Sequence, residues 1–287
     1  MWYSFYRTKM IYFRSIGYLG RLGNQLFQFS STIGISRKRG YKASFPIENC
    51  SRFINNGPID LKTGKMMDVK CDLLDCFDIP TSYFRPIEEL RPSAIYQERD
   101  FKFNSEVLTL PPHTDLYGYF QDERYFKEDR DFLLSILKFK DEYESTAQEF
   151  ISNIDTNYQK VSLHIRRGDY TLYPNHHPVC SKEYYQSAMK KFSPDGVKFL
   201  VFSDDIEWCR EEFKGDQFIF VDSGSPYSDL RIMTLCDHHI IANSSYSWWG
   251  AWLNTKDEKR VIAPSSWFGP AIDKDASEIY CEGWEKI

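Results

Sequence analysis

The chain has 287 residues, of which 42 % are hydrophobic; this suits one large domain or two modest ones and exceeds what a small disulfide-stapled scaffold needs. Its 36 basic and 41 acidic residues give a net charge of −5, which argues against a general nucleic-acid-binding protein, because such proteins normally carry a basic excess. No apolar run approaches the roughly 18 residues that span a bilayer, and basic residues interrupt the N-terminal segment. We therefore expect a soluble, cytoplasmic protein with no transmembrane segment.

The first half of the chain opens with an α/β pattern and then becomes irregular. Residues 11–16 form a predicted strand, and a glycine-rich loop leads from it into a helix that ends before Gly40. Prolines interrupt the pattern after that helix, until two further helices are predicted before the polar stretch 153–160. That stretch marks a boundary between two α/β domains, which we place at residues 1–155 and 156–287.

The second half alternates strands with helices. The predicted strands are residues 161–165, 197–202, 218–221, 239–242 and 260–263, and helical segments are predicted at 181–192, 206–213, 229–236 and 245–253. Strands that alternate with helices in this way indicate a parallel, doubly wound sheet. The sequence therefore predicts an α/β fold with parallel sheets.

Seven cysteines are scattered along the chain and form no Cys-x-x-Cys pair. The sequence therefore supports neither a zinc site nor a thioredoxin-like redox motif. Because a cytoplasmic protein is kept in a reducing compartment, we expect free thiols.

Polar side chains follow the ends of the predicted strands in the second half. In an open parallel sheet, ligands bind outside the carboxyl ends of the strands. The residues at those ends are His164, Arg166, Arg167 and Asp169, then Ser203, Asp204 and Asp205, and finally Asn243, Ser244 and Ser245. We expect these residues to line one rim.

The chemistry of that rim suits a nucleoside diphosphate. Two adjacent arginines match a polyanion, because a guanidinium fork binds two phosphate oxygens. Ser244 and Ser245 begin a helix whose free N–H groups and dipole form a second anion site. Carboxylates such as Asp204 and Asp205 accept hydrogen bonds from guanine N–H groups or ribose hydroxyls. Each element alone has an ordinary explanation, namely an ion pair, a turn or a helix cap, but their coincidence on one rim favours a nucleotide site.

The loop at residues 20–25 is a different glycine-rich turn. It matches neither the dinucleotide-binding fingerprint nor the phosphate loop that ends in Gly-Lys-Ser/Thr. Its glycines allow close approach of a ligand, and Asn24 and Gln25 offer amides at a helix N-terminus. Alone it is equally well explained as a tight turn; beside a nucleotide-binding domain we expect it to form the second side of a cleft.

Four segments carry a resemblance to a known family. Residues 164–170, His-Ile-Arg-Arg-Gly-Asp-Tyr, are similar to the H-x-R-R-x-D-Y signature of α-1,2-fucosyltransferases, glycosyltransferase family 11. Residues 20–29, 202–208 and 242–252 are similar to that family's G-x-L-G-N-Q-x-F-Q-[YF], F-S-D-D-x-x-W and N-S-S-[FY]-S-W-W-x-A-W motifs. The four segments span nearly the whole chain, and the double-tryptophan block is especially specific.

That resemblance implies a GT-B type glycosyltransferase made of two facing Rossmann-like domains. The implied reaction is the inverting, metal-independent transfer of L-fucose from GDP-β-L-fucose to the 2-hydroxyl of a terminal galactose. Residues 1–155 would form the acceptor side and residues 156–287 would bind GDP-fucose. The implied partners are GDP-fucose and a galactose-terminated oligosaccharide, with no cofactor, metal or nucleic acid. Because no membrane anchor is found, a soluble microbial or viral enzyme is expected.

The resemblance also assigns roles to residues. Arg166 would contact the β-phosphate of the donor with support from Arg167, while His164 and Asp204 would read guanine. Arg166, Asn24 and Asp169 are the implied catalytic residues, with Asn24 closing over the diphosphate. The implied donor site comprises Arg21, Gly23, Asn24, Gln25, His164, Arg166, Arg167, Asp204, Asp205, Asn243, Ser244, Ser245 and Tyr246. Two departures are Arg21, where many relatives carry a second glycine, and the unexplained residues 1–9.

The general base has several candidates. Asp169 belongs to the motif and can accept the proton of the acceptor hydroxyl, but it can instead hold Arg166 or Arg167 in an ion pair. His176 and His177 follow in the same loop and titrate near neutral pH. A further alternative is that no side chain acts and the departing phosphate takes the proton.

Two other classes of protein stay open at this stage. A metal-dependent nucleotide-sugar transferase would bind Mg²⁺ or Mn²⁺ through an Asp-x-Asp motif, and Asp129 and Asp131 have that spacing. A solvated helix face or a helix N-terminus explains that pair better. A non-catalytic glycan-binding protein would use the abundant aromatic residues for sugar stacking, but it would not need the arginine and aspartate pairs.

Overall fold

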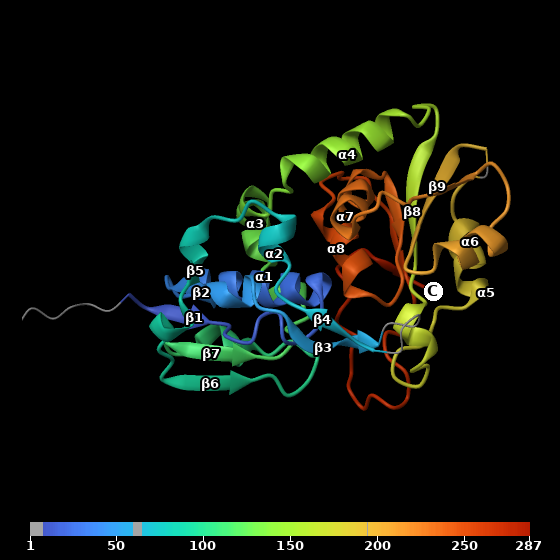
Figure 1. Ribbon diagram of the computed structural model, residues 1–287. Coiled ribbons are helices and arrows are strands. Elements are labelled where there is room, and N and C mark those ends of the chain that lie inside the picture. The colour runs from blue at the N-terminus through green and yellow to red at the C-terminus, as the bar shows by residue number, and fades with distance from the viewer. Residues whose placement is uncertain (1–7, 60–64, 194) are drawn as a thin grey trace, which may run out of the picture. The chain divides into compact units, whose positions relative to one another are not determined.

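The computed structural model describes residues 8–59, 65–193 and 195–287 (Figure 1). The chain divides into two compact units. The first unit comprises residues 1–57 and 68–138, and the second unit comprises residues 58–67 and 139–287. Each unit is built on a parallel sheet with helices, so the predicted α/β class is confirmed.

The sheet of the first unit has the strand order β5-β2-β1-β7-β6, with parallel neighbours throughout. Its strands are β1 (Met10–Tyr12), β2 (Lys42–Pro46), β5 (Phe84–Arg85), β6 (Ala94–Gln97) and β7 (Thr114–Tyr117). The chain builds outward from β1 on one side through β2 and β5, and β7 occupies the other side of β1. Such a reversal leaves a crevice outside the carboxyl ends of the two central strands.

Helix α1 (Leu22–Lys38) follows β1 and is buried along most of its length. Gly34 allows this packing, because a Cβ at that position would overlap the carbonyl oxygen of Tyr125. The helix ends where Gly40 adopts a φ of +63°, and the Gly40 N–H donates to the carbonyl of Arg37. The remaining elements of the first part of the chain are β3 (Ile54–Ile59) and β4 (Met66–Val69), which pair with each other, and helices α2 (Leu73–Cys76) and α3 (Arg130–Ile136).

The sheet of the second unit has the order β10-β9-β8-β11-β12-β13, also parallel. Its strands are β8 (Gln159–Ile165), β9 (Val197–Ser203), β10 (Phe218–Phe220), β11 (His238–Ile240), β12 (Val261–Ala263) and β13 (Glu285–Lys286). Its helices are α4 (Asp141–Ser152), α5 (Lys182–Met189), α6 (Ile206–Glu212), α7 (Pro226–Leu235) and α8 (Ser245–Leu253). This is the doubly wound order, and its reversal lies between β8 and β11.

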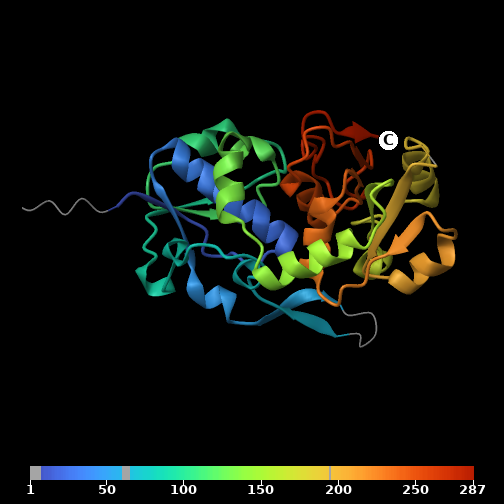
Figure 2. The ribbon, with the colours of Figure 1, turned by 90° about the horizontal axis from the view of Figure 1, so that it is seen from above.

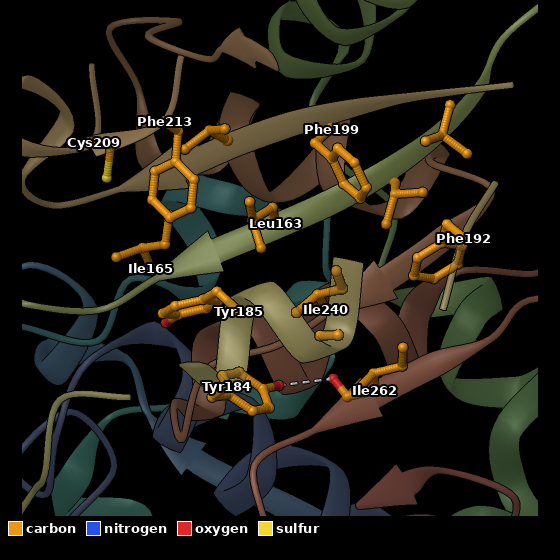
Figure 3. Packing of buried hydrophobic residues seen from close by; sticks show 14 residues of the cluster. Leu163, Ile165, Tyr184, Tyr185, Phe192, Phe199, Cys209, Phe213, Ile240 and Ile262 are labelled. Atoms are coloured by element: carbon orange, nitrogen blue, oxygen red, sulfur yellow. Dashed lines mark hydrogen bonds between the residues drawn. The ribbon is translucent and has the colours of Figure 1, made fainter. Parts of the chain in front are cut away.

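The core of the second unit fixes the position of β8. Leu163 and Ile165 are fully buried and point toward helix α5, as Figure 3 shows. From α5, the Tyr184 hydroxyl donates to the carbonyl of Ile241 at 2.6 Å and to that of Ile262 at 3.2 Å, and Figure 3 draws the second of these hydrogen bonds. Because Ile241 directly follows β11 and Ile262 lies within β12, one buried side chain ties the helix to both strands.

Helix α4 belongs to the second unit, where it packs along α7 (Figure 2). Glu144 forms an ion pair with Arg231 at 2.7 Å, and the rings of Tyr143 and Tyr227 meet at 5.3 Å. Ala147 completes the contact in the core. The division between units therefore falls between Lys138 and Phe139, earlier than the position predicted at 155/156, because a polar stretch before β8 is a surface turn and not a linker.

None of the helices within the described residues is long and apolar enough to cross a membrane.

Candidate functional site at the carboxyl edge of the second sheet

Strand register explains why the arginine and aspartate pairs meet. In the parallel pair β8–β9, Ile165 lies opposite Ser203. The residues that follow these two strands, Arg166 and Arg167 on one and Asp204 and Asp205 on the other, therefore emerge side by side. They emerge next to the reversal point between β8 and β11, where the predicted rim was placed.

Arg166 is held by two carboxylates and an aromatic ring. Its Nη1 lies 2.7 Å from Asp204 Oδ2, and its Nη2 donates to Asp169 Oδ1. The guanidinium carbon lies 5.1 Å from the centre of the Tyr170 ring. A guanidinium carries five N–H groups, so these two carboxylates leave donors for a further acceptor. The Asp169 contact corresponds to the structural alternative that the sequence left open for this residue.

Arg167 is turned toward helix α6. Its Nε donates to Asp205 at 2.9 Å, its backbone N–H donates to Asp204 Oδ1 at 2.9 Å, and its guanidinium lies 3.8 Å from the Trp208 ring centre. Asp204 thus uses one oxygen for Arg166 and the other for the Arg167 backbone. These partners favour a positioning role for Asp204 over the predicted reading of guanine.

Gly168 makes this arrangement possible. A Cβ at residue 168 would overlap Asp204 Oδ2. A side chain here would therefore require a shift of the carboxylate oxygen that faces Arg166 Nη1.

His164 is buried at the end of β8, and its Nδ1 has no hydrogen-bond partner among the described residues. Burial lowers the pKa of the imidazole to about 3, so the ring is neutral at physiological pH. Its ring centre lies 5.6 Å from that of Tyr246 in the first turn of α8. A buried polar atom without a partner costs free energy unless a ligand or water satisfies it.

The segment before α8 caps that helix and joins it to other parts of the chain. Ser244 caps the helix by accepting the backbone N–H of Tyr246, at 3.4 Å, and Ser245 occupies the first turn. The Asn243 side chain donates to the carbonyls of Pro178 and Trp267, at 2.9 and 3.0 Å. Asn243, predicted as a donor-binding residue, therefore has its amide N–H groups occupied in joining three segments of the chain.

Tyr170 belongs to a group of stacked aromatic rings that the sequence did not predict. The Tyr170 hydroxyl donates to the Asn243 carbonyl at 3.1 Å, and its ring stacks on His177 at 4.9 Å. The His177 ring in turn contacts Phe268, and burial lowers its pKa. His176 packs edge-on against Tyr173. The only signal for Tyr170 in the sequence is its place in the 164–170 motif.

Asp229 is a partly buried acidic residue for which the sequence predicts no special environment. It lies in the first turn of α7, where it accepts the Ser223 hydroxyl at 2.6 Å. Burial raises its pKa to about 6. In the sequence it is indistinguishable from an ordinary acidic residue at a helix N-terminus.

The glycine-rich loop of the first unit lies between β1 and α1. Gly17 and Gly20 adopt φ values of +85° and +87°, and a Cβ at Gly20 would overlap the Asn24 amide. Asn24 Oδ1 accepts a hydrogen bond from Gln121 Nε2 at 2.8 Å. Gln121 follows β7, so both amides lie at the reversal point of the first sheet.

Other predicted residues of this loop have structural surroundings. Gln25 donates to the carbonyls of Gly20 and Lys70 and accepts the Asp72 N–H, so its side chain fastens the loop. Arg21 is exposed and stands at the N-cap position of α1, and Gly23 is buried in its first turn.

The Asp-x-Asp pair has local partners. Asp129 precedes α3 and forms an ion pair with Arg37 at 2.5 Å, while Asp131 lies exposed in the first turn of α3. Among the residues that the structure describes, no group of three or more His, Cys, Asp or Glu is arranged to hold a metal ion.

Parallel, doubly wound sheets of this kind, one in each unit, are the architecture of GT-B type glycosyltransferases. The family model described as Glycosyl transferase family 11 matches residues 5–287, and the chain belongs to this family. The predictions of the family and of a glycosyltransferase are therefore confirmed.

Individual relatives agree with this assignment. The Alpha-1,2-colitosyltransferase of Escherichia coli is 29 % identical, over 87 % of this chain and 90 % of the relative. Galactoside alpha-(1,2)-fucosyltransferase 2 of Oryctolagus cuniculus is 24 % identical, over 92 % of this chain and 74 % of the relative. The crystal structure of POFUT1 in complex with GDP-fucose is similar in fold, with a TM-score of 0.51 at 15 % identity, covering 88 % of this chain and 97 % of that one.

Proposed function

We propose that the protein transfers L-fucose from GDP-β-L-fucose to the 2-hydroxyl of a terminal galactose, with inversion at the anomeric carbon and without a metal ion. The observation that carries this proposal is buried His164, whose Nδ1 has no hydrogen-bond partner within the described part of the chain, together with the doubly paired Arg166 at the reversal point of the second sheet. A nucleotide base can satisfy the imidazole, and a diphosphate can take the remaining guanidinium donors. Membership of family 11 supports the reaction class.

Arg166 is the residue that we assign to the leaving group. As the bond between fucose C1 and the β-phosphate oxygen breaks, negative charge grows on that oxygen, and a fixed guanidinium stabilises it more in the transition state than in the ground state. Asp169, Asp204 and Tyr170 hold the guanidinium in place before the donor arrives. The N-terminus of α8 at Ser244 supplies further N–H groups to the diphosphate.

The acceptor chemistry follows from the donor's configuration. The galactose 2-hydroxyl attacks C1 from the face opposite GDP, so a β-linked donor gives an α-linked product. The hydroxyl proton leaves with the attack. We assign Asp169 to holding Arg166 and not to taking this proton, because its Oδ1 already accepts the hydrogen bond from Arg166 Nη2. His177 or the departing phosphate then takes the proton.

A second donor sugar is supported by one relative. The Escherichia coli relative is named as a colitosyltransferase, so colitose is an alternative to fucose on the same nucleotide-binding edge. A cytoplasmic site of action is consistent with seven free cysteines.

The test is an assay of the purified protein with GDP-fucose and a panel of lactose, N-acetyllactosamine, type 1 and O-antigen oligosaccharides. The expected product is an α-1,2-linked fucoside, identified by mass and by linkage analysis, at a rate unchanged by excess EDTA. Loss of transfer in EDTA with recovery in Mn²⁺ would contradict metal independence and revive the Asp129 motif. Transfer from a colitosyl donor with none from GDP-fucose would change the donor sugar while leaving the site intact.

A further inference from the structure

Two cysteines of the first unit lie in contact and play no part in the proposed reaction. Cys50 ends the 3₁₀ turn Ile47–Cys50, and Cys71 follows β4. The Cys71 N–H donates to the Asn49 carbonyl at 2.8 Å, and the Cys71 thiol shares a hydrogen bond with the Cys50 thiol. Both thiols are reduced. Residues far apart in the sequence thus bring two sulfur atoms together.

The backbone around Cys50 supports the glycine-rich loop. Asn49, the residue before it, donates through Nδ2 to the carbonyls of Arg14 and Ile16, at 2.9 and 2.8 Å. Those carbonyls belong to the chain that leaves β1 toward Gly17. A movement of the backbone at Cys50 is therefore transmitted to the first half of the glycine-rich loop through the Asn49 side chain.

The backbone around Cys71 supports the other half of the loop. Gln25 in α1 donates to the carbonyl of Lys70 at 2.8 Å and accepts the N–H of Asp72 at 2.7 Å, so it grips the residues on both sides of Cys71. Gly17 packs on Cys71 so closely that a Cβ there would lie 2.7 Å from the Cys71 nitrogen. The two cysteines are thus built into the two supports of one loop.

The two thiols differ in accessibility. Cys50 is partly exposed, whereas Cys71 is fully buried. Burial, together with the neighbouring Cys50 thiol, holds the pKa of Cys71 well above its usual value, so Cys71 is a poor first target for an oxidant. A small oxidant in solution reaches Cys50 first.

We propose that Cys50 and Cys71 are a reversible oxidation site, at which hydrogen peroxide closes a disulfide that locks the support of the glycine-rich loop. The Cys50 sulfur attacks the peroxide, the O–O bond breaks, and a sulfenic acid and one water form. The Cys71 sulfur then attacks the sulfenic sulfur, the S–S bond forms, and a second water leaves. The two sulfurs lose two electrons and two protons in all, and the peroxide accepts them. A dithiol reductant restores both thiols by exchange.

The first experiment treats the full-length protein with hydrogen peroxide and maps its peptides without reduction. One cross-linked pair containing Cys50 and Cys71 is expected, together with its disappearance in dithiothreitol. Cys50→Ser abolishes the cross-link, and the matched control Cys236→Ser, at a buried thiol elsewhere, retains it. Wild-type protein that keeps both thiols free, or that carries Cys50 to the sulfinic acid without a cross-link, overturns the proposal.

The second experiment tests the order of events and the effect on the loop. In Cys71→Ala, a dimedone probe is expected to trap the sulfenic acid on Cys50; absence of the adduct in a folded variant contradicts the assignment of the attacking thiol. In oxidised wild type, hydrogen exchange of the amides at residues 14–25 is expected to slow relative to the reduced protein, and Cys50→Ser shows no such change. Unchanged exchange after complete cross-linking refutes the locking of the loop.

Discussion

The two units share a topology and use it for different chemistry. In the first unit β7 lies beside β1, and in the second unit β11 lies beside β8, so each sheet reverses its direction of growth at one point. The edge of the second sheet carries two adjacent arginines that are each paired with an aspartate, whereas the edge of the first carries the amide pair Asn24 and Gln121 beside the ion pair of Arg14 with Asp115. Topology fixes where a ligand binds, and the side chains fix which ligand.

The arginines at the second edge suit a phosphate, because a fixed guanidinium binds phosphate oxygens through charge-assisted hydrogen bonds. The amide pair at the first edge suits uncharged polar groups, which both donate and accept hydrogen bonds. The comparison therefore predicts large effects from changes of charge at the second edge and smaller ones from changes of hydrogen bonding at the first.

The largest effect is expected at Arg166. Arg166→Lys keeps the charge and loses the planar fork, so kcat should fall on the order of 10²–10³-fold while the donor KM rises less. Arg166→Ala should be worse still. Steady-state kinetics and thermal unfolding on the same samples check this. The exposed Arg210→Lys in α6 is the matched control. Near-normal kcat in a folded Arg166→Lys would remove the leaving-group role.

Glu98 of the first unit is expected to make the stability of the fold depend on pH. It accepts the backbone N–H groups of Tyr119 and Phe120, at 2.6 and 3.0 Å, and burial raises its pKa from 4.5 to about 7. Between pH 4.5 and about 7, Glu98 is ionised in the unfolded chain and protonated in the folded chain. The free energy of unfolding therefore falls as pH rises, by at most about 1.4 kcal/mol per pH unit. Above the folded pKa the loss levels off.

Glu98→Gln keeps an acceptor for the two N–H groups and cannot ionise. Relative to this variant, the wild type should become less stable as pH rises from 4.5 to about 7. Urea denaturation of both proteins across that range measures the difference. A difference that stays constant with pH would show that Glu98 titrates normally.

Much of the second unit could be predicted because its strands are long or apolar. Residues 161–165 and 197–202 were predicted as strands within two residues of β8 and β9. The later strands of the first unit could not be predicted, because β5 has only two residues and β6 exposes most of its side chains. Such strands carry no local pattern, and only their parallel neighbours define them.

The candidate site divides in the same way. The rule that ligands bind outside the carboxyl ends of parallel strands placed Arg166 and Arg167 at the carboxyl edge of the second sheet, where the structure has them. This could be predicted because both residues directly follow a strand in the sequence. The sequence could not distinguish Gln25 and Asn243, whose amides tie segments together, from groups that face a ligand. Gln121 was missed because its partner Asn24 lies 97 residues away in the sequence. A short sequence motif cannot indicate a contact between residues so far apart in the chain.

Asp204→Asn tests whether Asp204 contributes to GDP binding through its ion pair with Arg166. The variant loses the charge that pairs with Arg166, and GDP binding should weaken by about 1.5–3 kcal/mol. If Asp204 acts through Arg166, adding Asp204→Asn to Arg166→Ala should cause little further loss. Calorimetry on the single and double variants decides this. Full additivity would instead support a direct contact between Asp204 and guanine.

The smallest effect is expected at the first edge. Gln121→Met removes the hydrogen bond to Asn24, at a cost of about 0.5–1.5 kcal/mol in kcat/KM. The salt dependence of GDP binding should stay as in wild type, because no charge has changed. Arg166→Ala and Asp204→Asn, which each change one charge, should alter that dependence. A change in salt dependence for Gln121→Met would erase the distinction between the edges.

Gly168 makes the second edge sensitive to the addition of one methyl group. A Cβ at residue 168 would overlap Asp204 Oδ2, the oxygen that faces Arg166 Nη1. An alanine at this position therefore requires the Asp204 carboxylate to turn, and the geometry of its contact with Arg166 changes with it. The position of the guanidinium is thus set partly by a residue that has no side chain of its own.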